Sequence, residues 1–362
     1  MRGDDTKQAT LFSLVSPEQR VPQGHPLRPI KALTERVLSS LTRTFSRMYS
    51  KVGRPSIPPE RLLKAQILIA LYSVRSDRMF CEQLDYNLLF RWFLDMTMDE
   101  PGFDHSSFSK NRDRLLEHDV AGKFFAAVVI EARELGLMSN EHFSVDGTLI
   151  EAWASLKSFR PKDEDPDDRD PPDDPSNPTV NFHGEKRRND THESTTDPEA
   201  RLAKKGAGKE ARLCFSAHAL MENRNGMLVD LSVGSATGTA EREHALAMLK
   251  KHAAEGSTVG GDKGYNHRAF VEGCRELGIT PHVAEKAKHS AIDARTTRHA
   301  GYSWSMRIRK RIEEIFGWSK TTGGFRRTRF RGIRRTQQAG YFVGAALNLL
   351  RITRLAPLAA AA

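Results

Sequence analysis

The sequence is poor in cysteine, and its three cysteines, Cys81, Cys214 and Cys274, lie far apart. Without a CxxC pair or a nearby Cys/His set, the pattern indicates neither a disulfide framework nor a zinc site. No apolar run approaches the roughly 18 residues that suggest a membrane-spanning helix. The first residues, MRGDDTKQ, lack the apolar segment of a secretory signal. We therefore expect a reduced, cytoplasmic protein with no membrane partner.

A phosphate-binding loop is also missing. The glycine-containing stretches GSATGTAE and VGGDKGYN lack the Gly-Lys-Ser/Thr ending that a P-loop ATPase requires. What the sequence does carry is positive charge: the 362 residues have a formal net charge of +10, and 28% of the side chains are charged. A basic excess of this size favours a polyanionic partner, nucleic acid first and a membrane surface second.

The chain divides into three predicted parts. Residues 1–140 carry apolar residues at helical spacing and predict a mostly helical N-terminal domain. Residues 141–322 alternate between strand and helix patterns and predict an α/β domain. Within it, residues 163–174 contain eight acidic residues and three prolines, which predicts a disordered insertion over about 158–180. Residues 323–362 predict a basic, helical C-terminal tail.

Three carboxylates are notable for their positions. Asp146 lies in the predicted strand 141–150, Asp262 follows a short strand at 258–260, and Glu313 lies on a predicted helix over 305–318. The apolar residues of that helix form one stripe. A rotation of about 100° per residue places Glu313 at the edge of this stripe and Glu314 on the far side. Glu313 is therefore the glutamate that we expect to reach the strand ends.

Each carboxylate also suits an ordinary structural role, Asp146 and Asp262 in turns and Glu313 in a surface ion pair with Arg309. Their joint placement on two strands and a closing helix favours a metal site instead. An aspartate in the middle of a strand is costly to bury unless it is paired or binds a cation. Oxygen-only side chains suit Mg²⁺. Two such ions about 4 Å apart can activate a water and stabilise the leaving oxygen in phosphodiester cleavage.

Several segments together resemble one enzyme family. The segments GRPSIPPERLLKAQIL, FSVDGTLIEAWAS, GGDKGY and RIRKRIEEIFGWSK, in this order and spacing, resemble a DDE transposase of bacterial insertion sequences, in the group called insertion sequence five. The group's last signature is Tyr, two residues, Arg, three residues, Glu, six residues, Lys. Arg309, Glu313 and Lys320 match it, whereas Met306 stands at the tyrosine position.

The resemblance implies an α/β catalytic domain of the ribonuclease H-like fold, preceded by a mostly helical DNA-binding domain. It also implies that Asp146, Asp262 and Glu313 bind two Mg²⁺ ions, with Mn²⁺ as a substitute. The expected reaction is cut-and-paste transposition. Hydrolysis at the transposon ends releases a 3′-OH, which then attacks target DNA. The expected partners are the terminal inverted repeats, target DNA and a second copy of the chain, in a nucleoid-associated complex.

Two other functions stay open at this point. A non-catalytic DNA-binding protein derived from a transposase is one, and the presence of all three acidic residues argues against it. A metal-dependent nuclease or resolvase without strand transfer is the other. The residues alone do not separate this second alternative from a transposase, and only the resemblance does.

Basic side chains are the predicted DNA contacts. Residues 307–335 contain eleven Lys or Arg and two acidic residues, which is typical of a phosphate-binding stretch. The predicted contacts near the carboxylates are Lys263, Arg309 and Lys320, and those in the basic stretch are Arg326, Arg327 and Arg329. A candidate recognition helix adds Lys110 and Arg112. We expect Trp153, Trp304 and Trp318 to pack in the core.

Overall fold

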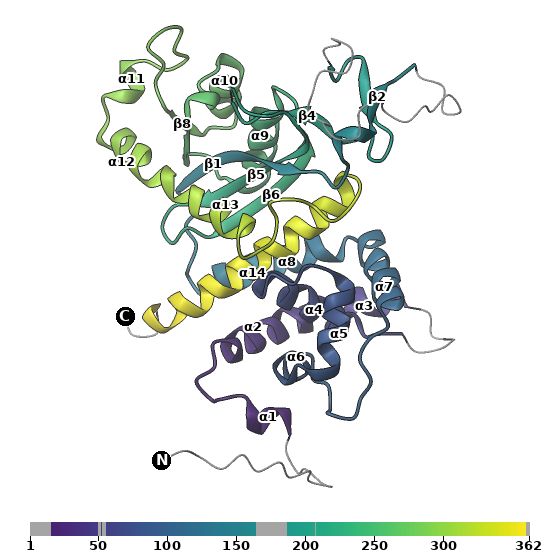
Figure 1. Ribbon diagram of the computed structural model, residues 1–362. Helices are drawn as coiled ribbons and strands as arrows, with labels where there is room; N and C mark the ends of the chain where they lie inside the picture. Colours follow the sequence, from purple (N-terminus) through teal and green to yellow (C-terminus); the bar gives the residue numbers. More distant parts are fainter. Residues whose placement is uncertain (1–15, 50–51, 53–55, 164–186, 207, 360–362) are drawn as a thin grey trace, which may run out of the picture.

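The computed structural model describes residues 16–49, 52, 56–163, 187–206 and 208–359. A mixed sheet with covering helices lies next to a bundle of N-terminal helices, and helix α14 (Ile333–Ala359) runs between them (Figure 1). Among the described residues, no helix is both long enough and apolar enough to cross a membrane.

The N-terminal part is helical, as the apolar spacing predicts. Its helices are α1 (Pro17–Arg20), α2 (Leu27–Ser40), α3 (Thr42–Met48), α4 (Pro59–Leu71), α5 (Asp77–Tyr86), α6 (Leu88–Phe93), α7 (His105–Glu117) and α8 (Val120–Glu134). Asp104 caps α7 by accepting a hydrogen bond from the Ser107 N–H at 2.8 Å. Helix α4 is buried on nearly every side, which explains why its sequence is apolar beyond a single stripe.

The second part alternates strands and helices. Its strands are β1 (His142–Glu151), β2 (Phe159–Pro161), β3 (His192–Ser194), β4 (Arg201–Ala203), β5 (Arg212–Glu222), β6 (Leu228–Ser235), β7 (Thr258–Gly261) and β8 (Thr280–Val283). Its helices before α14 are α9 (Ala240–His252), α10 (Arg268–Glu276), α11 (Ala294–Thr297), α12 (Ala300–Ile308) and α13 (Ile312–Lys320). Short 3₁₀ turns at Leu156–Ser158, Lys263–Tyr265 and Arg309–Arg311 complete it.

The main sheet is mixed. Strand β1 pairs antiparallel with β5 and parallel with β7, and β7 pairs parallel with β8. Strand β6 pairs antiparallel with β5, so the order across the sheet is β6-β5-β1-β7-β8, with the short β4 also on β5. Apolar residues alternate between the two faces of the strands. One set packs against α9 and α10, and the other packs against α8, α13 and α14.

Helix α14 is part of the core and not an appended tail, which corrects the sequence prediction for residues 323–362. It packs on α8, α4 and β6 through its buried residues, among them Phe342, Ala346, Leu349 and Ile352. The sequence interpretation gave weight to the arginines at 326–335. These precede the helix or fill its first turn, whereas the residues from 339 onward are mostly apolar.

Helix α14 also covers the edge of the sheet. The Asn348 side chain accepts a hydrogen bond from the Leu228 N–H at 3.0 Å and donates one to the Leu228 carbonyl at 2.8 Å. Gln337 does the same further along β6, with the Val233 N–H at 2.6 Å and the Leu231 carbonyl at 2.8 Å. Two amide side chains thus bind the backbone groups that a neighbouring strand would otherwise take.

Two further sequence predictions need correction. The acidic insertion was expected to begin at about residue 158, but Phe159 is buried and begins β2, which pairs with β3. The most acidic part lies outside the described residues. The helix expected over 305–318 is interrupted, because α12 ends at Ile308 and a 3₁₀ turn separates it from α13.

Candidate active site

Asp146 and Asp262 occupy matching positions on neighbouring strands. In the parallel pair β1–β7, Ser144 lies opposite Gly260, so the residue two positions further on β1 lies level with the residue that follows β7. Those residues are Asp146 and Asp262. The Oδ1 atom of each accepts a hydrogen bond from a nearby glycine, from the Gly147 N–H at 2.8 Å and from the Gly264 N–H at 2.7 Å. The sheet therefore brings the two carboxylates together.

The charge of Asp146 is unfavourable in its environment. Burial, together with the charges of Asp262 and Glu241, raises the pKa of Asp146 to about 6, although the Gly147 N–H and the charge of Arg309 act to lower it. Raised carboxyl pKa values from burial and like charges are typical of catalytic sites. A divalent cation would relieve this repulsion, because it favours the ionised carboxylates.

Glu313 lies in the first turn of α13, and its side chain is exposed. The uninterrupted helix used to orient it in the sequence does not exist, and both Glu313 and Glu314 face solvent. Their contacts still distinguish them. Glu314 lies 3.5 Å from the guanidinium of Arg351 on α14, whereas Glu313 makes no hydrogen bond or ion pair to any described residue. Since α13 packs on β1, Glu313 lies on an element next to Asp146.

The residues suit a divalent cation by their chemistry. Mg²⁺ prefers oxygen ligands, keeps several waters and commonly uses only one or two protein carboxylates together with substrate phosphates. Asp146 and Asp262 supply two such carboxylates. Within the described ranges, no three His, Cys, Asp or Glu side chains are gathered closely enough to hold a metal by themselves. The chemistry of Asp146 and Asp262 therefore fits a cation that keeps several of its waters.

Comparison with known families decides the identity. Residues 141–349 match the family described as a transposase DDE domain, which is more than half of the chain. Residues 15–114 match the family described as a transposase domain (DUF772). The chain belongs to the DDE transposases. Its function is the catalysis of DNA transposition, and its second domain has the ribonuclease H-like fold that the sequence predicts.

Two solved structures are similar to this transposase at low identity. The first is a synaptic complex of the piggyBac transposase with hairpin DNA, with 10% identity, a TM-score of 0.43, and coverage of 94% of this chain and 77% of that chain. The second is a Mos1 transposase paired-end complex with the left transposon end, with 9% identity, a TM-score of 0.20, and coverage of 88% and 86%. At these scores neither likeness supports an inference about residues of this transposase.

The basic residues nearest the aspartates differ in their exposure and in the hydrogen bonds that their side chains make. Lys263 is exposed, directly follows Asp262 and makes no side-chain hydrogen bond or ion pair to the described residues. Arg309 is half-buried, and its Nε atom has no hydrogen-bond partner among the described residues. Lys320 instead donates hydrogen bonds to Thr148 Oγ1 at 2.6 Å and to the Leu149 carbonyl at 2.8 Å, so it fixes α13 to β1.

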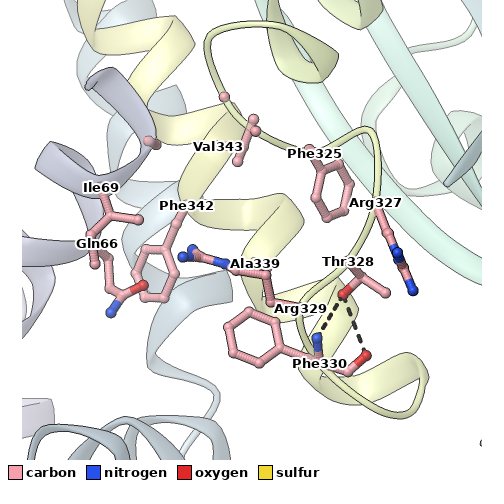
Figure 2. A pocket seen from close by; sticks show the side chains of 13 residues that line it. Gln66, Ile69, Phe325, Arg327, Thr328, Arg329, Phe330, Ala339, Phe342 and Val343 are labelled. Atoms are coloured by element: carbon pink, nitrogen blue, oxygen red, sulfur yellow. Dashed lines mark hydrogen bonds between the residues drawn. The ribbon is translucent and has the colours of Figure 1, made fainter. Parts of the chain in front are cut away.

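The arginines of the loop before α14 are not equivalent either. Figure 2 shows Arg329 and Phe330 between α14 and the α4 residues Gln66 and Ile69. Arg329 donates a hydrogen bond to the Val74 carbonyl at 3.0 Å, and burial lowers its pKa. Arg327 donates to the carbonyls of Ala152 and Trp153, at 3.2 and 2.8 Å. Arg326 is exposed and its side chain is unengaged by described residues, which makes it the best placed of the three to meet a phosphate.

The candidate recognition helix α7 shows the same contrast. Lys110 is exposed. Arg112 forms an ion pair with Asp77 on α5, and its guanidinium lies 4.7 Å from the centre of the Phe330 ring. Arg112 therefore joins two helices to the loop before α14.

Trp153 and Trp304 are 50% and 54% exposed, so the prediction that they pack in the core is wrong, whereas Trp318 does pack against it.

Sequence reasoning missed one acidic residue of the site, Glu241. It lies in the first turn of α9, and its charge raises the pKa of Asp146. A methyl group placed on Gly147 would lie 3.0 Å from Glu241 Cγ, and one on Gly264 would lie 3.5 Å from Glu241 Oε2. Glu241 belongs to the segment GTAEREHA, whose spacing does not show which of its two acidic residues faces the strands.

Proposed function

We propose that this transposase hydrolyses the phosphodiester bond at the ends of its element and then joins the released end to target DNA. The observation that supports this most directly is the placement of Asp146 and Asp262 at level positions on β1 and β7, within the matched DDE domain. Glu313 is the third acidic residue, on the helix that packs against β1.

The two steps use the same kind of displacement at phosphorus. In the first step, a water oxygen attacks the phosphorus and loses a proton to solvent, the bond from phosphorus to the 3′ oxygen breaks, and a 3′-OH remains. In the second step, this 3′ oxygen attacks a target phosphodiester, and the target's own 3′ oxygen leaves with a proton. Two Mg²⁺ ions, or Mn²⁺, would supply water activation and charge stabilisation when bound.

The protein residues contribute position and charge. Asp146, Asp262 and Glu313 would hold the cations, with the two aspartates fixed by the N–H groups of their neighbouring glycines. Lys263, Arg309 and Arg326 would contact the DNA backbone, and Lys110 would do so from α7. The partners would be the element's inverted repeats and target DNA. A homodimer would pair the two ends of the element in a nucleoid-associated complex.

The test uses DNA that flanks the transposase gene in its genome, incubated with the full-length protein and Mg²⁺. We expect cleavage that leaves 3′-OH ends, followed by their transfer to a second duplex. Asp146→Asn and Asp262→Asn should each lower cleavage by several orders of magnitude, while DNA binding without metal stays close to wild type. Glu314→Gln is the matched control for Glu313→Gln. Normal cleavage by Asp262→Asn would refute this site.

A further inference from the structure

The carboxylate of Glu241 lies near the two glycines that donate hydrogen bonds to Asp146 and Asp262. Its Oε1 atom would lie 3.1 Å from a methyl group on Gly147, the residue after Asp146. Its Oε2 atom would lie 3.5 Å from a methyl group on Gly264, whose N–H holds Asp262. Helix α9 thus presents a carboxylate to the two glycines that fix the catalytic aspartates. The absence of a side chain at Gly147 makes this approach possible.

A buried histidine faces the same space. His218 on β5 lies opposite Gly147, its side chain is fully buried, and its Nδ1 atom has no hydrogen-bond partner among the described residues. A methyl group on Gly147 would lie 3.0 Å from that Nδ1 atom. Glu241 and His218 therefore meet the same small region above Gly147.

The hydrogen bonds of Ser216 indicate which ring nitrogen of His218 carries the proton. The Ser216 hydroxyl donates to the Ser235 carbonyl at 3.1 Å, so its oxygen is left to accept from His218 Nε2 at 3.0 Å. With its proton on Nε2, the neutral imidazole has a lone pair on Nδ1. The space above Gly147 is consequently bordered by two acceptors, a carboxylate and an imidazole nitrogen.

The buried Nδ1 atom of His218 requires a hydrogen-bond donor in this space, because an unpaired buried acceptor is unfavourable. The nearby Tyr265 hydroxyl is also buried without a partner among the described residues. Burial raises the pKa of Tyr265, and the charges of Asp146, Glu241 and Asp262 raise it further.

We propose that Glu241 is a further catalytic residue, which binds the divalent cation of this site beside Asp146 and Asp262, with His218 Nδ1 accepting a hydrogen bond from a cation-bound water. The proposal rests on the proposed function, since it assigns another ligand to the same centre. Because these described side chains are not gathered closely enough to hold a bare ion, the cation would keep waters between itself and some of them, as Mg²⁺ does when bound to protein.

The alternative is a purely structural role, in which Glu241 stabilises the N-terminus of α9 as an acidic residue in the first turn of a helix does. Glu243 separates the two roles. It lies in the same first turn and is also exposed, so it shares any effect on the helix terminus. Unlike Glu241, it is not among the side chains nearest to a methyl group on Gly147 or Gly264.

The test measures Mn²⁺ binding to the full-length protein by electron paramagnetic resonance, with and without end DNA, and the Mn²⁺ concentration needed for cleavage. We expect Glu241→Gln to weaken Mn²⁺ binding, and to raise the concentration needed, by about ten- to hundredfold. Glu243→Gln should match wild type. Gly147→Ala, which puts a methyl group into the proposed cation site, should weaken binding with all carboxylates present. Thermal unfolding of each variant checks the fold.

Wild-type Mn²⁺ binding and a wild-type Mn²⁺ requirement in Glu241→Gln would overturn the proposal. Equal losses in Glu241→Gln and Glu243→Gln would also overturn it, because they would point to the helix terminus. Failure of the proposed function would look different: Asp146→Asn and Asp262→Asn would then leave Mn²⁺ binding and cleavage unchanged.

Discussion

Asp146 illustrates how a carboxylate that we propose to bind a cation opposes folding. Its folded-state pKa of about 6 lies above the ordinary value of 3.8, so ionisation destabilises the folded state. The penalty is absent below the ordinary value, develops as the pH rises from about 4 to 6, and is complete above 6. The difference between the two values corresponds to about 3 kcal/mol.

We therefore predict that Asp146→Asn stabilises the metal-free protein at pH 7.5 by up to about 3 kcal/mol. Urea unfolding in the presence of a chelator measures this. At pH 4.5 most of the gain should disappear, since Asp146 itself is then largely protonated. A variant that is no more stable than wild type at pH 7.5 would show that the ionised carboxylate does not destabilise the folded state.

The sequence predicts Asp146 and Asp262 as site residues from their places in a strand and directly after one, together with the family resemblance, and the β1–β7 register places them level. It did not foresee the 3₁₀ turn at Arg309–Arg311, because helical periodicity carries no mark of a change in hydrogen-bond pattern. Glu241 was missed for another reason. The direction of a side chain at a helix N-terminus depends on packing between distant segments, here α9 on β1 and β5.

At the scale of elements, α14 shows how composition misleads. Its arginines suggested a basic tail, but its amide side chains bind the backbone of β6. A sequence shows that asparagine and glutamine are present in a helix, but it does not show that their partners lie more than a hundred residues away. Strands β1 and β7 and most helices were predicted because their apolar periodicity is local, whereas the short strands β2, β3 and β4 were not predicted.

We predict that Asn348→Leu lowers the free energy of unfolding by about 2–4 kcal/mol, because the buried N–H and carbonyl of Leu228 lose their partners. Chemical denaturation measures this loss. Arg354→Ala, on an exposed position of the same helix, should change stability by less than about 0.5 kcal/mol. Equal effects of the two substitutions would contradict the role given to Asn348.

At the scale of the whole molecule, the positive charge divides into two classes. Some basic residues hold the structure together, such as Arg112 with Asp77 and Arg329 with the Val74 carbonyl. Others, such as Lys263 and Arg326, stay exposed and unengaged by described residues. The net charge of +10 predicted a polyanionic partner but did not show which residues are available to it.

We predict that replacing Lys263 and Arg326 by glutamine weakens DNA binding on any sequence and reduces the slope of log K against log salt concentration by about one per residue. Fluorescence anisotropy at several salt concentrations measures this. Arg329→Gln is the contrasting variant. It should lower the melting temperature while the salt slope of the folded protein stays unchanged. A reduced slope for Arg329→Gln would reverse the assignment.

The amide contacts of α14 with β6 also determine when the fold can be completed. A ribosome makes α14 after every strand of the sheet, so the edge of β6 stays open from its own synthesis until α14 emerges. Until Gln337 and Asn348 emerge, that edge can pair with strands of other nascent chains. Fragments that stop before residue 333 should keep this liability permanently, and we expect them to accumulate as aggregates and not as an isolated catalytic domain.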